Sequence, residues 1–275
     1  MRKKMSYLQN LHTHSSYCDG MDTPERMLMI AKEKGFQSIG FSGHSYMYYA
    51  PSHSMTEAGT KLYEQEIRYL KQRYDGIMDV FYGLEVDIFS DINLTGYDYL
   101  IGSVHYLKIG DKIVGIDRPA QIVHEVIDRY FRGDGLAYAK AFYQTVAQLP
   151  EYGNFDIIGH FDLITKHMEK EMLFDTEAKE YRWAAIEAAE ALAGKIPYFE
   201  VNTGAIARGF RTSPYPQPFL LKELNRLGFG AVISSDCHDA RQVDCYFTES
   251  EELLKSCGFK AQYVLKKEGF VPVEL

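Results

Sequence analysis

The sequence predicts an α/β barrel in which short strands alternate with longer helices. Short apolar runs, rich in β-branched and aromatic residues, are separated by longer segments with helical spacing. Several of these runs end at a histidine or a carboxylate, as expected where barrel strands present functional groups at their C-terminal ends. The chain has 275 residues and 46% hydrophobic content, enough to bury one large core. Because there is no linker, repeat or low-complexity tract, we expect a single domain over residues 1–275.

Seven runs are short and apolar enough to be strands of this barrel. They cover residues 7–12, 38–42, 80–86, 99–105, 157–160, 197–201 and 231–235. Six intervening segments have helical spacing, and they cover residues 24–34, 57–74, 120–131, 137–149, 176–193 and 218–227. Gly35, Gly194 and Gly228 follow three of these helices, where a left-handed residue commonly ends a helix. Residues 106–117 predict a hairpin around Gly110, and residues 262–273 predict one or two final strands.

The composition excludes several classes of partner. A net charge of -8 and a pI near 5.6 give no broad attraction to nucleic acid or to anionic lipid. No run approaches the roughly 18 apolar residues that a membrane-spanning helix needs. The four cysteines form no CxxC pair, which favours reduced thiols. We therefore expect a cytoplasmic protein with a small-molecule substrate, and the sequence leaves its oligomeric state open.

The clearest local motif is the pair His12 and His14 at the end of the first apolar run. Alternation along a strand places both imidazoles on one face, where they can hold one cation. Alone this pair is only moderately specific, because such pairs are at least as often exposed to solvent. Asp236 and His238 repeat the spacing after the last predicted strand of the barrel, and Cys237 between them is expected to be buried on the opposite face.

Five further residues occupy similar positions. Four of them stand at the ends of other apolar runs and one lies on the first loop: His44, Glu85, His105, His160 and Asp19. Any one of them is more simply a turn residue or a hydrogen-bonded core histidine, but together they predict a metal-dependent hydrolase with its site at one end of the barrel. His53, His124 and His167 follow no apolar run and are expected at the surface, outside the site.

These motifs, taken in order along the whole chain, resemble the polymerase and histidinol phosphatase (PHP) superfamily, and within it the monofunctional histidinol-phosphate phosphatases. The resemblance rests on His12-Thr-His14-Ser, Asp19-Gly20, Gly43-His44, Gly83-Leu-Glu85-Val-Asp87, Ser103-Val-His105, Gly159-His160-Phe-Asp162, Glu200-Val-Asn202-Thr203 and Ser235-Asp236-Cys-His238. It departs from the usual family pattern at Gly43, where an acidic residue often precedes the histidine.

The resemblance implies a distorted barrel of seven strand-helix units with three divalent metal ions. The implied ligands are His12, His14, Glu85 and Asp236 for the first metal, Glu85, His105 and His160 for the second, and Asp19, His44 and His238 for the third. Asp19, His44, Glu85 and Asp236 would form the catalytic set. Imidazole and carboxylate ligands suit zinc, manganese and iron, so the metal identity stays open.

The implied reaction is hydrolysis of L-histidinol phosphate in histidine biosynthesis, by water that the metals activate. The resemblance places a phosphate-binding arginine at Arg208, with Arg211 as the alternative, and Asn202 would orient its strand end. Asp87, Asp91 and Asp162 are candidates for binding the imidazole and amine of the substrate. Two alternatives remain open: a phosphatase for a nucleotide, sugar phosphate or phosphotyrosine, and a non-catalytic metal-binding module.

Overall fold

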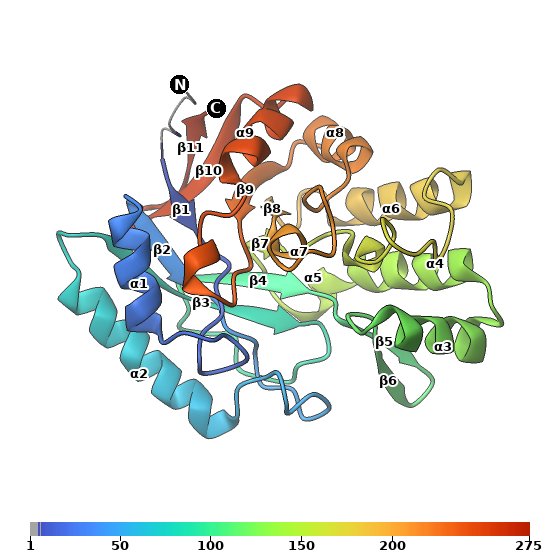
Figure 1. The fold of residues 1–275 in the computed structure, drawn as a ribbon, viewed down its shortest axis with the longest axis horizontal. Helices are drawn as coiled ribbons and strands as arrows, with labels where there is room; N and C mark the ends of the chain where they lie inside the picture. The colour runs from blue at the N-terminus through green and yellow to red at the C-terminus, as the bar shows by residue number, and fades with distance from the viewer. Residues whose placement is uncertain (1–4, 6) are drawn as a thin grey trace.

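The computed structural model describes residue 5 and residues 7–275. Seven parallel strands form a nearly closed barrel in the order β1-β2-β3-β4-β7-β8-β9, with helices outside it (Figure 1). The strands are β1 (Gln9–Asn10), β2 (Ser38–Phe41), β3 (Asp79–Asp87), β4 (Tyr99–Ser103), β7 (Ile157–Ile158), β8 (Tyr198–Asn202) and β9 (Gly230–Ser234). The predicted α/β barrel of seven strands is confirmed.

All six predicted helices are present, with ends shifted by a few residues. They are α1 (Pro24–Glu33), α2 (Glu57–Arg73), α3 (Ala120–Phe131), α4 (Gly135–Val146), α6 (Lys179–Leu192) and α8 (Pro218–Arg226). Thr23 and Thr56 begin α1 and α2, because each side chain accepts a hydrogen bond from a backbone N–H of the first turn. No helix in the described part of the chain is long and apolar enough to cross a bilayer.

Three further α-helices of the described chain were not predicted from the sequence: α5 (Leu149–Tyr152), α7 (Gly204–Ala207) and α9 (Phe247–Ser256). The longest of them, α9, buries Phe247, Glu251 and Leu254, a helical spacing of four and three residues. The sequence did not predict this helix because the segment is rich in serine and glutamate and its buried face includes the carboxylate of Glu251, so the apolar periodicity is weak.

The hairpin predicted over residues 106–117 forms, and the final strands predicted over residues 262–273 pair as a second hairpin. The first consists of β5 (Tyr106–Ile109) and β6 (Lys112–Gly115), paired antiparallel, and it lies beside α3 (Figure 1). The second consists of β10 (Ala261–Lys266) and β11 (Gly269–Glu274). Its Leu265 joins the side chains inside the barrel, and the backbone of Leu265 exchanges two hydrogen bonds of 2.7 Å with the side chain of Gln9. The second hairpin therefore closes the end of the barrel opposite the strand tips.

The seam between β1 and β9 is joined mainly by single contacts. Thr13 forms an isolated bridge with Cys237, and the His14 backbone N–H donates to the Cys237 carbonyl at 2.9 Å. The amide of Asn10 donates to Ser235 Oγ at 2.6 Å. The predicted strand 7–12 is shorter in the structure, because only Gln9 and Asn10 pair regularly with β2 and Thr13 forms only an isolated bridge.

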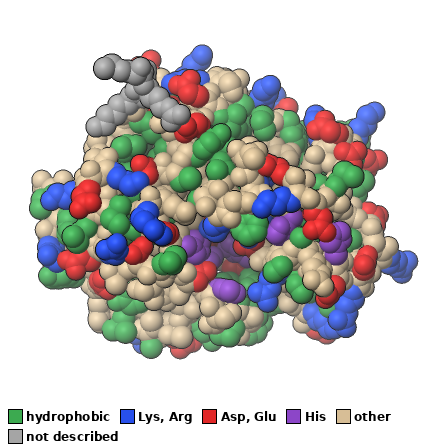
Figure 2. Space-filling model, viewed as in Figure 1, with side chains coloured by type: hydrophobic (Ala, Val, Ile, Leu, Met, Phe, Trp, Pro, Cys, Tyr) green, Lys and Arg blue, Asp and Glu red, His purple; other side chains and the backbone are tan. Residues whose placement is uncertain are grey.

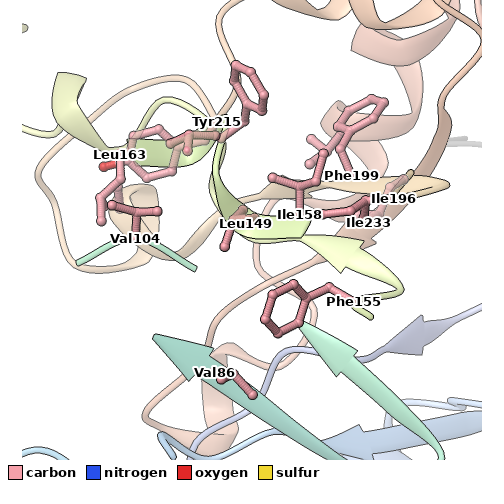
Figure 3. Close-up of a cluster of buried hydrophobic side chains, with 14 of the residues drawn as sticks. Val86, Val104, Leu149, Phe155, Ile158, Leu163, Ile196, Phe199, Tyr215 and Ile233 are labelled. Carbon is pink, nitrogen blue, oxygen red and sulfur yellow. The ribbon is translucent and has the colours of Figure 1, made fainter. Parts of the chain in front are cut away.

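Alternation along β3 assigns opposite faces to its residues. Phe81 lies in the cluster inside the barrel, whereas Val80, Tyr82 and Leu84 belong to the core that packs beneath the helices. Figure 3 shows part of this outer core, where Val86, Ile158, Phe199 and Ile233 come from four different strands. The inward row of β3 continues from Phe81 through Gly83 to Glu85, so the apolar interior leads directly to a carboxylate at the strand end.

Tyr99 of β4 fills the middle of the barrel and is 1% exposed. Its ring lies against the backbone of Gly40 and Gly83, where a Cβ atom on either residue would collide with it. Its hydroxyl donates to the Leu11 carbonyl, one residue before His12. Tyr99 therefore links four strands just below the strand tips.

We expect Tyr99→Phe to lower the free energy of unfolding by about 1–3 kcal/mol, because the buried Leu11 carbonyl loses its donor. Urea denaturation would measure the change. Tyr69→Phe is the matched control, since Tyr69 is 57% exposed and should tolerate the change. Equal stabilities for the two variants would contradict the role of the Tyr99 hydroxyl.

Candidate metal centre

Nine residues that the sequence singled out meet at the C-terminal end of the barrel. Figure 2 shows histidines gathered in a hollow near the centre of this face. The nine are His12, His14, Asp19, His44, Glu85, His105, His160, Asp236 and His238. Three groups of these residues could each hold one metal ion, because all the ligand atoms of a group lie within 4.8 Å of one another.

Glu85 lies at the centre of the cluster and is 1% exposed. Its Oε2 atom lies 3.3 Å from His12 Nε2, 3.5 Å from His14 Nε2 and 2.8 Å from His44 Nδ1. Its Oε1 atom faces the other way. It lies 3.2 Å from His105 Nε2 and 3.0 Å from His160 Nε2. The two oxygens of one carboxylate thus face two separate sets of imidazoles.

Asp19 and Asp236 complete the cluster from two loops. Asp19 Oδ1 lies 3.3 Å from His238 Nε2, and Asp19 Oδ2 lies 3.7 Å from His44 Nε2. Asp236 Oδ1 lies 3.1 Å from His14 Nε2. The three groups are His14, Asp19, His44 and His238; His12, His14 and Asp236; and His44, Glu85 and His105.

The donor atoms of this cluster fit divalent metals. His12 Nε2, Asp19 Oδ1 and Glu85 Oε2 are buried and have no hydrogen-bond partner. Buried polar atoms normally have hydrogen-bond partners. Unpartnered nitrogen and oxygen atoms gathered in one cluster therefore indicate a site for a bound ion. Imidazole nitrogens and carboxylate oxygens are the ligands that zinc, manganese and iron take in proteins.

The charges inside the cluster are strongly coupled. Burial would raise the pKa of Glu85, but the neighbouring imidazoles of His12, His105 and His44 hold that pKa well below its usual range. Burial lowers the pKa of His14 to about 3, helped by His238 and His44. The lowered pKa leaves the His14 imidazole neutral, the form in which a histidine binds a metal ion.

Glu200 contacts the cluster on the side away from the cavity. No role was assigned to it from the sequence. It is fully buried, and its Oε2 atom lies 2.9 Å from His12 Nδ1. Its Oε1 atom accepts hydrogen bonds from the His160 backbone N–H at 2.7 Å and from the Asn202 side chain at 2.8 Å. Asn202 also donates to Asp236 Oδ2 at 3.3 Å. Glu200 therefore orients His12, as carboxylates behind metal-binding histidines commonly do.

None of the three acidic candidates for the substrate's imidazole and amine lines the cavity in front of the cluster. Asp87 is buried and accepts hydrogen bonds from the His105 backbone and from the Tyr49 hydroxyl, at 2.9 and 2.5 Å. Asp162 is buried and accepts a hydrogen bond from the Gln217 backbone at 2.9 Å, while Asp91 is exposed away from the site. The cavity lining therefore gives none of the three support as a substrate ligand.

The cavity has a volume of about 250 Å³, with the cluster as its floor. Its outer wall and rim come from the first hairpin with the residues after it and from the loops that follow β2, β7 and β8. They include Met47, His53, Tyr106, Gly115, Asp117, Arg118, Leu163, Lys166 and Arg208. Of these residues, the sequence assigned only Arg208 to the site and placed His53 outside it. The others were not singled out, because hairpin and loop residues carry no strand-tip signal.

Two of the three histidines predicted at the surface and outside the site differ from that prediction in one respect each. His53 is 47% exposed, but it lines the rim of the cavity, with Nδ1 3.9 Å from Asp19 Oδ2. His167 is buried, with Nε2 2.8 Å from the Arg118 carbonyl. His124 is partly exposed and pairs with Glu171, as expected of a surface histidine. Loop packing, which the local sequence does not encode, accounts for both differences.

Arg208 and Arg211 have different environments. Arg208 lines the cavity, where Nη2 lies 3.1 Å from Asp236 Oδ2 and Nη1 donates to the Asp236 carbonyl at 3.0 Å. Arg211 is 6% exposed, donates to Thr165 and Ser213, and lies over the Tyr215 ring at 4.5 Å. Of these two arginines, only Arg208 lines the cavity.

Comparison with known proteins agrees with this fold. The PHP domain family model matches residues 10–204, and the chain therefore belongs to the PHP domain family. It is 27% identical over 268 residues to the probable histidinol-phosphatase of Deinococcus radiodurans, covering 92% of this chain and 95% of that one. It is 26% identical to the histidinol-phosphatase of Bacillus subtilis, covering 90% of this chain and 98% of the relative.

A solved structure has the same fold. The histidinol phosphate phosphatase of Lactococcus lactis, complexed with zinc, L-histidinol and phosphate, superimposes with a TM-score of 0.73. The identity is 21%, over 96% of this chain and 98% of that chain.

The environment of Arg211 predicts a structural role. We expect Arg211→Ala to lower the free energy of unfolding by about 2–4 kcal/mol, because charged hydrogen bonds and a cation–π contact are lost. Arg241→Ala is the control, since Arg241 is 78% exposed and pairs only with Asp239, and we expect little change there. Thermal and urea unfolding would measure both, and a stable Arg211→Ala protein would contradict the assignment.

Proposed function

We propose that the whole chain, residues 1–275, forms one domain that hydrolyses L-histidinol phosphate to L-histidinol and inorganic phosphate, a step of histidine biosynthesis. The observation that carries the proposal is the Glu85 cluster, whose unpartnered donor atoms form the floor of a cavity that Arg208 borders. The substrate is supported by two relatives of matching length that are named histidinol-phosphatase.

Three metal sites are proposed within the cluster. The ligands are His12, His14, Glu85 and Asp236 for the first, Glu85, His105 and His160 for the second, and Asp19, His44 and His238 for the third. The opposed faces of Glu85 support its role as a bridge. Bound divalent metals supply positive charge for the phosphate oxygens and activate a water nucleophile. Zinc is the first candidate because the relative from Lactococcus lactis binds it, and manganese and iron stay alternatives.

The protein's own residues would act mainly by orientation and charge. Asp19, His44, Glu85 and Asp236 form the proposed catalytic set, each fixed from more than one side. Arg208 is the proposed phosphate ligand, because its planar guanidinium can bind two phosphate oxygens at once. Its contacts with Asp236 hold it at the edge of the cavity before substrate binds. Preorganised charge of this kind is a major source of rate enhancement in phosphate transfer.

A phosphatase for another ester, such as a nucleotide, sugar phosphate or phosphotyrosine, is the alternative, and a non-catalytic metal-binding module is the less favoured one. The presence of all nine candidate ligands within one cluster disfavours a module that has lost its activity. The oligomeric state, a cytoplasmic location and the expectation of neither nucleic acid nor membrane as partner stay predictions.

Turnover of histidinol phosphate, compared with p-nitrophenyl phosphate, tests the function. We expect the first to have much the higher kcat/KM, and we expect both activities to disappear with a chelator and return with zinc, manganese or iron. His12→Ala should remove nearly all activity and lower the metal content. Equal kcat/KM values would favour the other phosphatases, and a metal-loaded protein without activity would favour the module.

Arg208→Ala should weaken phosphate binding and leave the metal content unchanged. Loss of one charged, two-pronged contact should raise KM, and the inhibition constant of inorganic phosphate, by about 10- to 100-fold. Steady-state kinetics with phosphate as inhibitor would measure this, with Arg241→Ala as the control. Unchanged phosphate inhibition would exclude Arg208 as the phosphate ligand.

A further inference from the structure

The outer wall of the cavity contains a carboxylate that has no place in the proposed metal sites. Asp117 follows β6, at the base of the first hairpin, and lines the cavity. The other carboxylates that line the described cavity are Asp19, Glu85 and Asp236, all proposed metal ligands. Asp117 therefore supplies the cavity with a negative charge that does not belong to the proposed metal ligands.

Half of the Asp117 carboxylate is available to a ligand. Oδ1 accepts a hydrogen bond from Lys166 Nζ, whereas no described residue donates a hydrogen bond to Oδ2. The side chain is 32% exposed, so this oxygen can be reached through the cavity. Burial alone would raise the pKa of Asp117, but Lys166 and Arg208 lower it to about 2, so the group is ionised at neutral pH.

The neighbours of Asp117 suit an organic leaving group. Tyr106 and Leu163 line the same wall, and the Tyr106 ring packs edge-on against Tyr49 with 5.0 Å between ring centres. Phosphate bound on the floor beside Arg208 would direct the rest of an ester toward this wall. An aromatic and apolar surface next to one free carboxylate oxygen fits a ring that carries a nearby cation.

We propose that Asp117 is a specificity-determining residue, which binds the ammonium group of the leaving alcohol through its free oxygen. The inference rests on the proposed function and adds the residue that selects a cationic amino alcohol. The ammonium is the better partner because it is charged throughout the neutral range, whereas a free imidazole titrates near pH 6.5. Lys166 and the first hairpin position the carboxylate.

The alternative is that Asp117 only anchors Lys166, which lies 4.4 Å from the Phe210 ring centre. A purely structural role would change the hydrolysis of every substrate to the same extent. A recognition role would change only substrates that carry the cation. Comparison of charged and uncharged leaving groups therefore separates the two.

The experiment uses Asp117→Asn, with Asp111→Asn as the matched control. Asp111 lies in the turn of the same hairpin, is exposed and does not line the cavity. We expect Asp117→Asn to lower kcat/KM for histidinol phosphate by about 10- to 100-fold, mainly through KM. Hydrolysis of p-nitrophenyl phosphate should change little, Asp117→Glu should restore part of the preference, and Asp111→Asn should behave as the unaltered protein.

A deaminated analogue of histidinol phosphate, which keeps the imidazole, provides a second test on the unaltered protein. On the unaltered protein, the kcat/KM of the analogue should fall below that of histidinol phosphate by about the factor that Asp117→Asn causes. With the analogue, Asp117→Asn should lower kcat/KM no further, because the analogue already lacks the contact that the substitution removes. This measurement also decides the matter if Asp117→Asn fails to fold, since full activity on the analogue would overturn the inference.

The outcomes separate this inference from the proposed function. No preference for histidinol phosphate in the unaltered protein would overturn both. A clear preference that Asp117→Asn retains, or an equal loss with both esters, would overturn the role of Asp117 and leave the proposed function intact.

Discussion

Burial of the Glu85 carboxylate among five imidazoles is the constraint on which the site depends. Removal of one ion from water costs several kcal/mol in a protein interior, and only close opposite charges or metals offset it. Glu85 lies at the end of an inward row of side chains that begins with Phe81 in the apolar interior. The barrel must therefore bring the ends of five strands, β1, β2, β3, β4 and β7, together around one carboxylate.

The fold meets that demand by fixing the interior just below the strand tips. Tyr99 spans the barrel and binds the carbonyl before His12, and two glycines leave room for its ring. The seam between the first and last barrel strands is completed by Asn10 and by the contact between His14 and Cys237. The last hairpin closes the far end through Leu265. Rigid support of this kind is needed, because misplacement by about 1 Å is enough to weaken catalysis severely.

The two ends of the cavity differ in how they are built. The floor consists of strand tips whose side chains are oriented by buried partners such as Glu200. The wall consists of a hairpin and loops, joined by the pairing of Lys166 with Asp117 and of His167 with the Arg118 carbonyl. Under the proposed function, the strand tips would carry the reaction chemistry, and the hairpin and loops would select among substrates.

The sequence by itself determined the barrel, its seven strands, six of its helices and the nine residues of the cluster. These depend on local alternation and on the rule that strand ends meet at one face, so residues 12 to 238 could be grouped without coordinates. Tertiary structure alone decided that Arg208 rather than Arg211 faces the cavity, that Glu200 supports His12, and that Asp117 and His53 border the site. These features depend on how loops pack across large distances in the chain, and no local pattern of residues encodes that packing.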